Sequence, residues 1–156
     1  LVNGEIVEDM PTPLHGLTVI ALIKWLLKYL EAHPEAGTLL TEVRIKLPQD
    51  EDQAHIPDIS FVLREQGDFY RKEPLSFVPA LCIEIQSPGQ SDRYMSDLAQ
   101  YYLTNDGKLV WLVYPDRKLV EWLTANERHL LTVEKSLSGW DVLPEFSLAV
   151  RDVFDF

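Results

Sequence analysis

The longest apolar pattern in the chain lies between residues 12 and 33 and predicts an amphipathic helix. Its apolar side chains recur at steps of three and four residues, as one buried helix face requires: Val19, Leu22, Ile23, Leu26, Leu27 and Leu30. Thr12 followed by Pro13 is a typical helix start, with a hydroxyl cap and a proline at the first helical position. Pro34 and Gly37 then predict the end of the helix.

Short runs of β-branched and aromatic residues predict strands in most of the rest. We expect strands over 41–47, 56–63, 79–87, 109–114, 119–123 and 130–133, and a second helix from Ser91 or Asp92 to about Thr104. Asn3-Gly4 indicates a hairpin within residues 1–10, residues 48–55 read as a loop, and 139–156 as short strands and turns. The most apolar run, 79–87, is expected at the centre of the sheet. No linker or repeat divides residues 1–156, so the prediction is one α/β domain with a mixed sheet flanked by helices.

The first helix carries more apolar surface than one sheet would cover. Leu17, Ile20 and Trp25 lie beside its main apolar face and widen it. Because exposed apolar patches of this kind mark interfaces, we predict a homodimer.

Composition narrows the classes of protein that fit. A single cysteine excludes a disulfide framework and a cysteine-based zinc site, and favours the reducing cytoplasm. No membrane span is expected, because the apolar run 14–30 is short and contains Lys24 and Lys28. With 25 acidic and 14 basic residues the net charge is −11. This charge argues against a general nucleic-acid binder, although a bound cation and a local basic strip would still allow contact with phosphates.

Two acidic residues interrupt apolar strand-like runs: Asp58 within 56–63 and Glu84 within 81–86. A carboxylate among apolar neighbours costs several kcal/mol, on the order given by transfer energies, unless it is paired, protonated or bound to a metal. If the two strands are neighbours, both carboxylates can reach one cation, with the Ile85 carbonyl completing part of its shell. Such oxygen ligands suit Mg²⁺ or Mn²⁺, which would activate water and stabilise charge on a phosphoryl oxygen.

Structural roles would also explain these acids. Asp58 follows Pro57 and could satisfy backbone N–H groups at a strand start, and Glu84 could pair with a buried arginine or lysine. The alternative fold is an unrelated α+β arrangement in which the two acids face different sides. Spacing alone leaves these alternatives open.

Several segments resemble a known family in their order and spacing: residues 4–10, His15-Gly16, 57–62, 83–88, and 102 through 111–115. The chain is similar, over nearly its whole length, to the Uma family of predicted restriction endonucleases, which belongs to the PD-(D/E)xK nuclease superfamily and is abundant in cyanobacteria. The resemblance implies a restriction-endonuclease-like core and Mg²⁺-dependent hydrolysis of phosphodiester bonds in DNA. It also implies that Asp58 and Glu84 are the two acidic residues of the family motif.

The chain departs from the family at the lysine of that motif. Its position is taken by Gln86, and the position to which related sequences move the lysine is Leu98. Arg93 is the nearest cation, and a guanidinium can stabilise charge but cannot act as a neutral base. We expect Gln86 to orient water or phosphate. Two functions follow: an endonuclease, weakened or inactive without its lysine, and a catalytically degenerate member that serves as a binding or regulatory module.

Other residues carry weaker signals. His15 matches a family position near the start of the first helix, but a lone histidine can equally bond its own loop. Glu5 and Glu42 are possible extra ligands that fit a hairpin and a solvated strand face at least as well. Cys82 is expected to be a buried structural thiol, and Trp111 a core residue.

Overall fold

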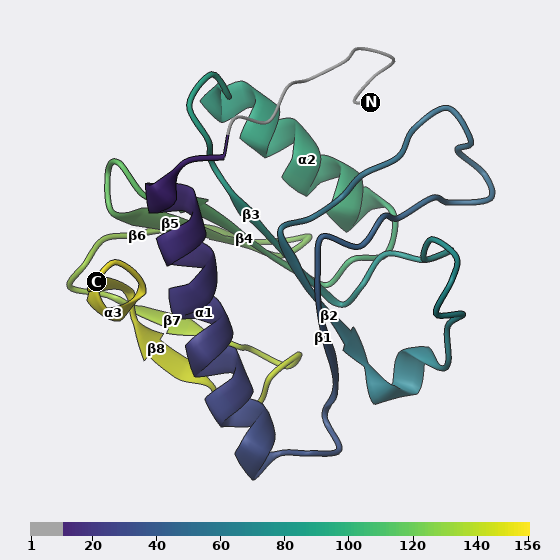
Figure 1. Ribbon diagram of the computed structural model, residues 1–156, viewed down its shortest axis with the longest axis horizontal. Helices are drawn as coiled ribbons and strands as arrows, with labels where there is room; N and C mark the ends of the chain where they lie inside the picture. The colour runs from purple at the N-terminus through teal and green to yellow at the C-terminus, as the bar shows by residue number, and fades with distance from the viewer. Residues whose placement is uncertain (1–10) are drawn as a thin grey trace.

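The computed structural model describes residues 11–156 (Figure 1). The expected hairpin of residues 1–10, and Glu5 with it, lie outside the described residues. In chain order the elements are α1 (Pro13–Ala32), β1 (Gly37–Thr41), β2 (Ile59–Leu63), the 3₁₀ turn η1 (Arg64–Gln66), β3 (Leu81–Ile85), α2 (Asp92–Thr104), β4 (Leu109–Tyr114), β5 (Leu119–Leu123), β6 (Arg128–Leu131), β7 (Ser136–Ser138), β8 (Ser147–Ala149) and α3 (Val150–Val153).

Six strands form one mixed sheet in the order β1-β2-β3-β4-β5-β6. β3 and β4 run parallel and are joined by α2, whereas the other neighbouring strands are antiparallel. β3, the most apolar segment, is central as expected, and all five of its residues are buried. These features confirm the α/β fold with a mixed sheet flanked by helices.

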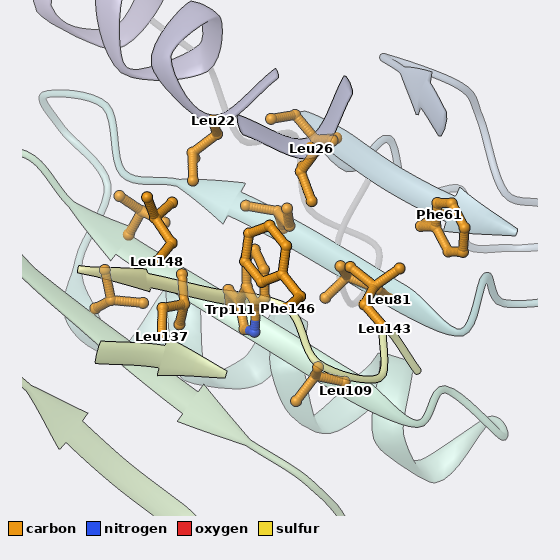
Figure 2. Close-up of a cluster of buried hydrophobic side chains, with 14 of the residues drawn as sticks. Leu22, Leu26, Phe61, Leu81, Leu109, Trp111, Leu137, Leu143, Phe146 and Leu148 are labelled. Carbon is orange, nitrogen blue, oxygen red and sulfur yellow. The ribbon is translucent and has the colours of Figure 1, made fainter. Parts of the chain in front are cut away.

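Helices cover both faces of this sheet (Figure 1). On one face, α1 packs through Leu22 and Leu26, together with the β7–β8 hairpin and α3. Figure 2 shows Trp111 of β4 beneath Phe146, and the two rings stack with centroids 5.7 Å apart. α2 covers the other face in a second apolar cluster. Trp111 is therefore a core residue, as its pattern predicted.

α1 begins as its sequence predicted. Thr12 accepts a hydrogen bond from the His15 amide, and Pro13 occupies the first helical position. The helix has 20 residues, and an 18-residue stretch of it has a mean hydropathy of 1.2, so by length and composition alone it could cross a membrane. A core helix of a soluble protein passes the same test, and one face of α1 packs on the sheet.

The segment 41–47 is where the predicted strand was wrong. β1 ends at Thr41, and Glu42 takes a left-handed conformation with φ 52°. Side chains 43–47 do alternate between buried and exposed, but the backbone makes only isolated bridges, from Ile45 to His55 and Leu75. Continued pairing with β2 is blocked because Pro57 has no N–H to donate. The tail also ends in a helical turn, α3, where strands and turns were expected.

Candidate active site at the ends of β2 and β3

Strand pairing brings the two acidic residues to the same end of the sheet. β2 and β3 are antiparallel, with Ile59 opposite Ile83. Asp58 immediately precedes β2, and Glu84 follows Ile83, so the same register places the two acids opposite each other. The prediction of neighbouring strands is confirmed, although Asp58 lies one residue outside the strand.

Asp58 is held by two side-chain contacts. Its Oδ2 accepts a hydrogen bond of 2.7 Å from the Ile85 amide, and its Oδ1 lies 3.2 Å from Nε2 of His15 on α1. The side chains of His15 and Asp58 are only 9% and 13% exposed. Asp58 thus does satisfy a backbone N–H, as the structural alternative required. That structural role needs only the bond to the Ile85 amide and does not explain why His15 lies beside Oδ1.

Glu84 is held from the opposite face of the sheet. The hydroxyl of Tyr102, on α2, donates a hydrogen bond of 2.9 Å to Glu84 Oε2. Burial, with the charge of Glu84 adding to it, raises the pKa of Tyr102 well above its usual value, so the hydroxyl remains a donor. Within residues 11–156 no arginine or lysine is buried. An arginine or lysine buried within this part of the chain therefore does not account for Glu84.

A buried histidine supports this tyrosine. His55 is 2% exposed, and its ring lies 3.9 Å from that of Tyr101 and 5.9 Å, edge-on, from that of Tyr102. Burial lowers the pKa of His55 to about 4, so the imidazole is neutral at pH 7. These contacts fasten the 48–55 loop to α2 beside Glu84.

Gln86, directly beyond β3, belongs to a polar chain. Its Nε2 donates to the Gln90 carbonyl at 2.9 Å and to Oδ1 of Asp92 at 3.0 Å. Arg117 donates to both oxygens of Asp92, at 2.8 and 3.1 Å. Hydrogen bonds from Arg117, and then from Gln86, lower the pKa of Asp92, which keeps it charged. Arg93 is exposed on the first turn of α2.

Leu98, the second position at which the family resemblance implied a lysine, is packed among apolar side chains. Leu98 is 4% exposed and belongs to the same core cluster as Tyr102, one helical turn further on. Cys82 lies in this cluster too, fully buried, and burial followed by the charge of Glu84 raises the pKa of its thiol. A thiol of this kind is inert, as predicted for a structural cysteine.

The donor set fits a hard cation that keeps its own water. Asp58 and Glu84 offer carboxylate oxygens, and no group of three or more His, Cys, Asp or Glu side chains suited to a metal occurs among the residues described. Mg²⁺ is commonly bound through one or two carboxylates, with waters and substrate phosphates completing its shell. The residues present therefore suit Mg²⁺ or Mn²⁺ better than a cation that needs an all-protein cage.

A mixed sheet flanked by helices, with two acids at the ends of neighbouring strands, is the nuclease-like arrangement that the resemblance implied. The chain belongs to the Uma2 family, described as "Putative restriction endonuclease", whose model matches residues 1–151. No curated protein matches it. Its fold is similar to that of a crystal structure from Anabaena variabilis ATCC 29413, described as "a putative nuclease belonging to DUF820". The TM-score is 0.83 at 20% identity, over 98% of this chain and 87% of the other.

Two side chains at this end of the sheet were not predicted as site residues. Tyr102 entered the sequence analysis only as part of the family resemblance, with no site role. A fully buried tyrosine needs a partner for its hydroxyl, and that requirement was the available signal. Arg117 carried no local signal, because its contact with Asp92 spans 25 positions.

Proposed function

We propose that this protein is a metal-dependent endonuclease that hydrolyses phosphodiester bonds in DNA. Asp58 and Glu84 are the proposed ligands of one Mg²⁺ or Mn²⁺ ion, with the Ile85 carbonyl as a third. One observation supports this most strongly: Asp58 Oδ2 lies 2.7 Å from the Ile85 amide nitrogen, which is bonded directly to the Glu84 carbonyl carbon. That oxygen is therefore within about 5 Å of the Glu84 Cα, by standard backbone dimensions.

Each residue has a defined task in this proposal. The ion, when bound, supplies a Lewis acid for the phosphoryl oxygen and lowers the pKa of a water. Ile85 and His15 hold Asp58 in place, and the Tyr102 hydroxyl holds Oε2 of Glu84. Gln86 orients water through its amide oxygen, because its amide nitrogen donates to Gln90 and Asp92. Arg93 is a candidate for charge stabilisation.

The proposal includes a homodimer formed through the outer face of α1. Leu17, Ile20 and Leu27 are 48%, 64% and 48% exposed on this face. Lys24 and Lys28 lie over the ring of Trp25, at 4.9 and 5.3 Å from its centre. A second copy would cover this apolar surface, and nucleases that cut both strands often act as dimers. We place the protein in the cytoplasm, because its single cysteine favours a reducing compartment.

A binding or regulatory module is the second candidate function. Two observations favour it: Gln86 stands at the lysine position with its amide engaged by neighbouring residues, and Leu98 is packed in the core. In that case the acids stabilise the fold and no phosphodiester bond is cut.

A cleavage assay separates these functions. Plasmid and single-stranded DNA are incubated with the wild type, Glu84→Gln and Glu73→Gln in Mg²⁺, Mn²⁺ or EDTA. Glu73 is an exposed carboxylate that serves as the matched control. We expect metal-dependent cleavage by the wild type and Glu73→Gln, reduced by about 10²-fold or more in Glu84→Gln, in line with the loss of a group that stabilises transition-state charge. Absence of cleavage, together with absence of DNA binding at low salt, would reject the nuclease in favour of the module.

A further inference from the structure

Arg117, in the turn between β4 and β5, can supply the positive charge that the family motif assigns to its lysine. β3 and β4 are parallel, so the carboxyl ends of both strands lie at the end of the sheet that carries Glu84. The Gln86 amide donates to the Val113 carbonyl at 2.9 Å, which places residue 86 beside the end of β4. The turn after β4 closes with the Arg117 amide on the Tyr114 carbonyl, at 3.2 Å. Arg117 therefore lies at the same end of the sheet as the two acids.

The guanidinium of Arg117 is held in a fixed position from two sides. Asp92 accepts from both terminal nitrogens, and the ring of Tyr114 lies 4.6 Å beneath the guanidinium carbon. Gln86 reaches the same carboxylate, and so connects the lysine position to the arginine. A bidentate carboxylate and an aromatic face both order a guanidinium, which reduces the entropy lost when it binds an anion.

Arg117 still has capacity to bind a ligand. A guanidinium has five N–H donors, and two are used on Asp92. The side chain is 47% exposed, so a ligand can reach it from solvent. The candidate suggested by sequence, Arg93, is exposed as well, but in the part of the chain that the structure describes it has no hydrogen bond or ion pair that would fix it in place.

We propose that Arg117 is the phosphate-binding cation of this site, held there by Asp92 and Gln86 in place of the absent lysine. This inference rests on the proposed function, because the phosphate it binds is that of the DNA substrate. Its planar donors would pair with two oxygens of the phosphate, and Asp58 and Glu84 would hold a metal ion that binds the same phosphate. Arg117 binds charge and transfers no proton, because arginine stays protonated.

The test is DNA binding by three variants that each remove one positive charge: Arg117→Gln, Arg93→Gln and Lys118→Gln. Lys118 is the matched control, since it is exposed on the same turn. Affinity for a labelled duplex is measured with Ca²⁺ in place of Mg²⁺, across a range of salt concentrations, after circular dichroism has verified that each variant is folded.

We expect Arg117→Gln to lose about tenfold or more in affinity, the usual size of a hydrogen-bonded charge contact. The negative slope of log K against log salt should become less steep by about 0.9, as for one lost phosphate contact. Lys118→Gln should change affinity less than about threefold, through general electrostatics alone. Arg93→Gln, which removes the alternative cation, should lose less affinity than Arg117→Gln. Arg117→Lys should restore the slope but only part of the affinity, because it keeps the charge and loses the planar pair of donors.

Two results would overturn the inference while the nuclease stands: a wild type that binds and cleaves DNA with Arg117→Gln matching Lys118→Gln, or a loss that falls on Arg93→Gln instead. A wild type that neither binds nor cleaves DNA would reject the proposed function, and the role of Arg117 with it.

Discussion

Removal of one hydroxyl, by Tyr102→Phe, isolates the contact that holds Glu84. Tyr102 is 0% exposed and Glu84 is 7% exposed, so water does not replace the lost donor readily. A hydrogen bond to a charged group contributes roughly 1.5–3 kcal/mol, and we expect a loss of about 2 kcal/mol in the free energy of unfolding at pH 7. For a chain of this size that corresponds to a fall in Tm of about 4–8 °C.

Urea and thermal unfolding measure this loss, and Tyr29→Phe is the matched control. The Tyr29 hydroxyl donates to the carbonyl of Pro144 at 2.8 Å in a solvent-exposed contact. Its removal should cost less than about 1 kcal/mol, as for a bond between neutral groups. In the metal account, Tyr102→Phe also weakens Mn²⁺ binding by roughly 10–100-fold, the usual effect of losing a residue that orients a ligand. Equal stability of the two variants would show that the hydrogen bond from Tyr102 to Glu84 does not stabilise the fold as expected.

Three further expectations concern other parts of the chain. The pKa of His55 is about 4 in the folded protein, against about 6.5 unfolded, so its contribution to stability is complete above pH 6.5 and is lost as pH falls towards 4. The fall in the free energy of unfolding over this pH range is on the order of 3 kcal/mol. Urea titrations should show this fall in His129→Gln, as in the wild type, but not in His55→Gln. Identical pH profiles for the two variants would contradict the role of His55. Leu98→Lys should increase the cleavage rate while lowering Tm, because a buried ammonium is brought towards Glu84; destabilisation without a gain in rate would count against the missing lysine as the limiting feature. Light scattering at micromolar concentration should give a dimer mass for the wild type and a monomer mass for Ile20→Glu, and a monomeric wild type would contradict the dimer.

Sequence reasoning predicted the elements whose pattern is local. The bounds of α2, β4 and β5 were anticipated closely, because periodicity, caps and turn residues all agree there. Neighbouring strands for the two acids were also anticipated, because both acids interrupt apolar strand-like runs; Asp58 lies one residue before β2. The family resemblance matched His15 to a position near the start of the first helix, and the structure places its Nε2 3.2 Å from Oδ1 of Asp58.

Features that depend on distant contacts were not predictable in this way. The alternation of residues 43–47 imitates a strand, yet pairing ends because Glu42 adopts a left-handed conformation and Pro57 lacks a donor. The hydrogen bond from Tyr102 to Glu84 connects a helix to a strand, and Arg117 reaches Asp92 from another turn. No local pattern encodes such contacts, because they depend on how the layers pack.

Binding of Mn²⁺ tests the central claim most directly. Calorimetric titration of the wild type, Asp58→Ala, Glu84→Ala and the exposed control Glu73→Ala reports the ion without depending on turnover. We expect one ion per chain for the wild type and Glu73→Ala, and loss of binding in both Asp58→Ala and Glu84→Ala while each remains folded. Equal binding by all four proteins, or binding by none, would show that these two carboxylates do not form a metal site.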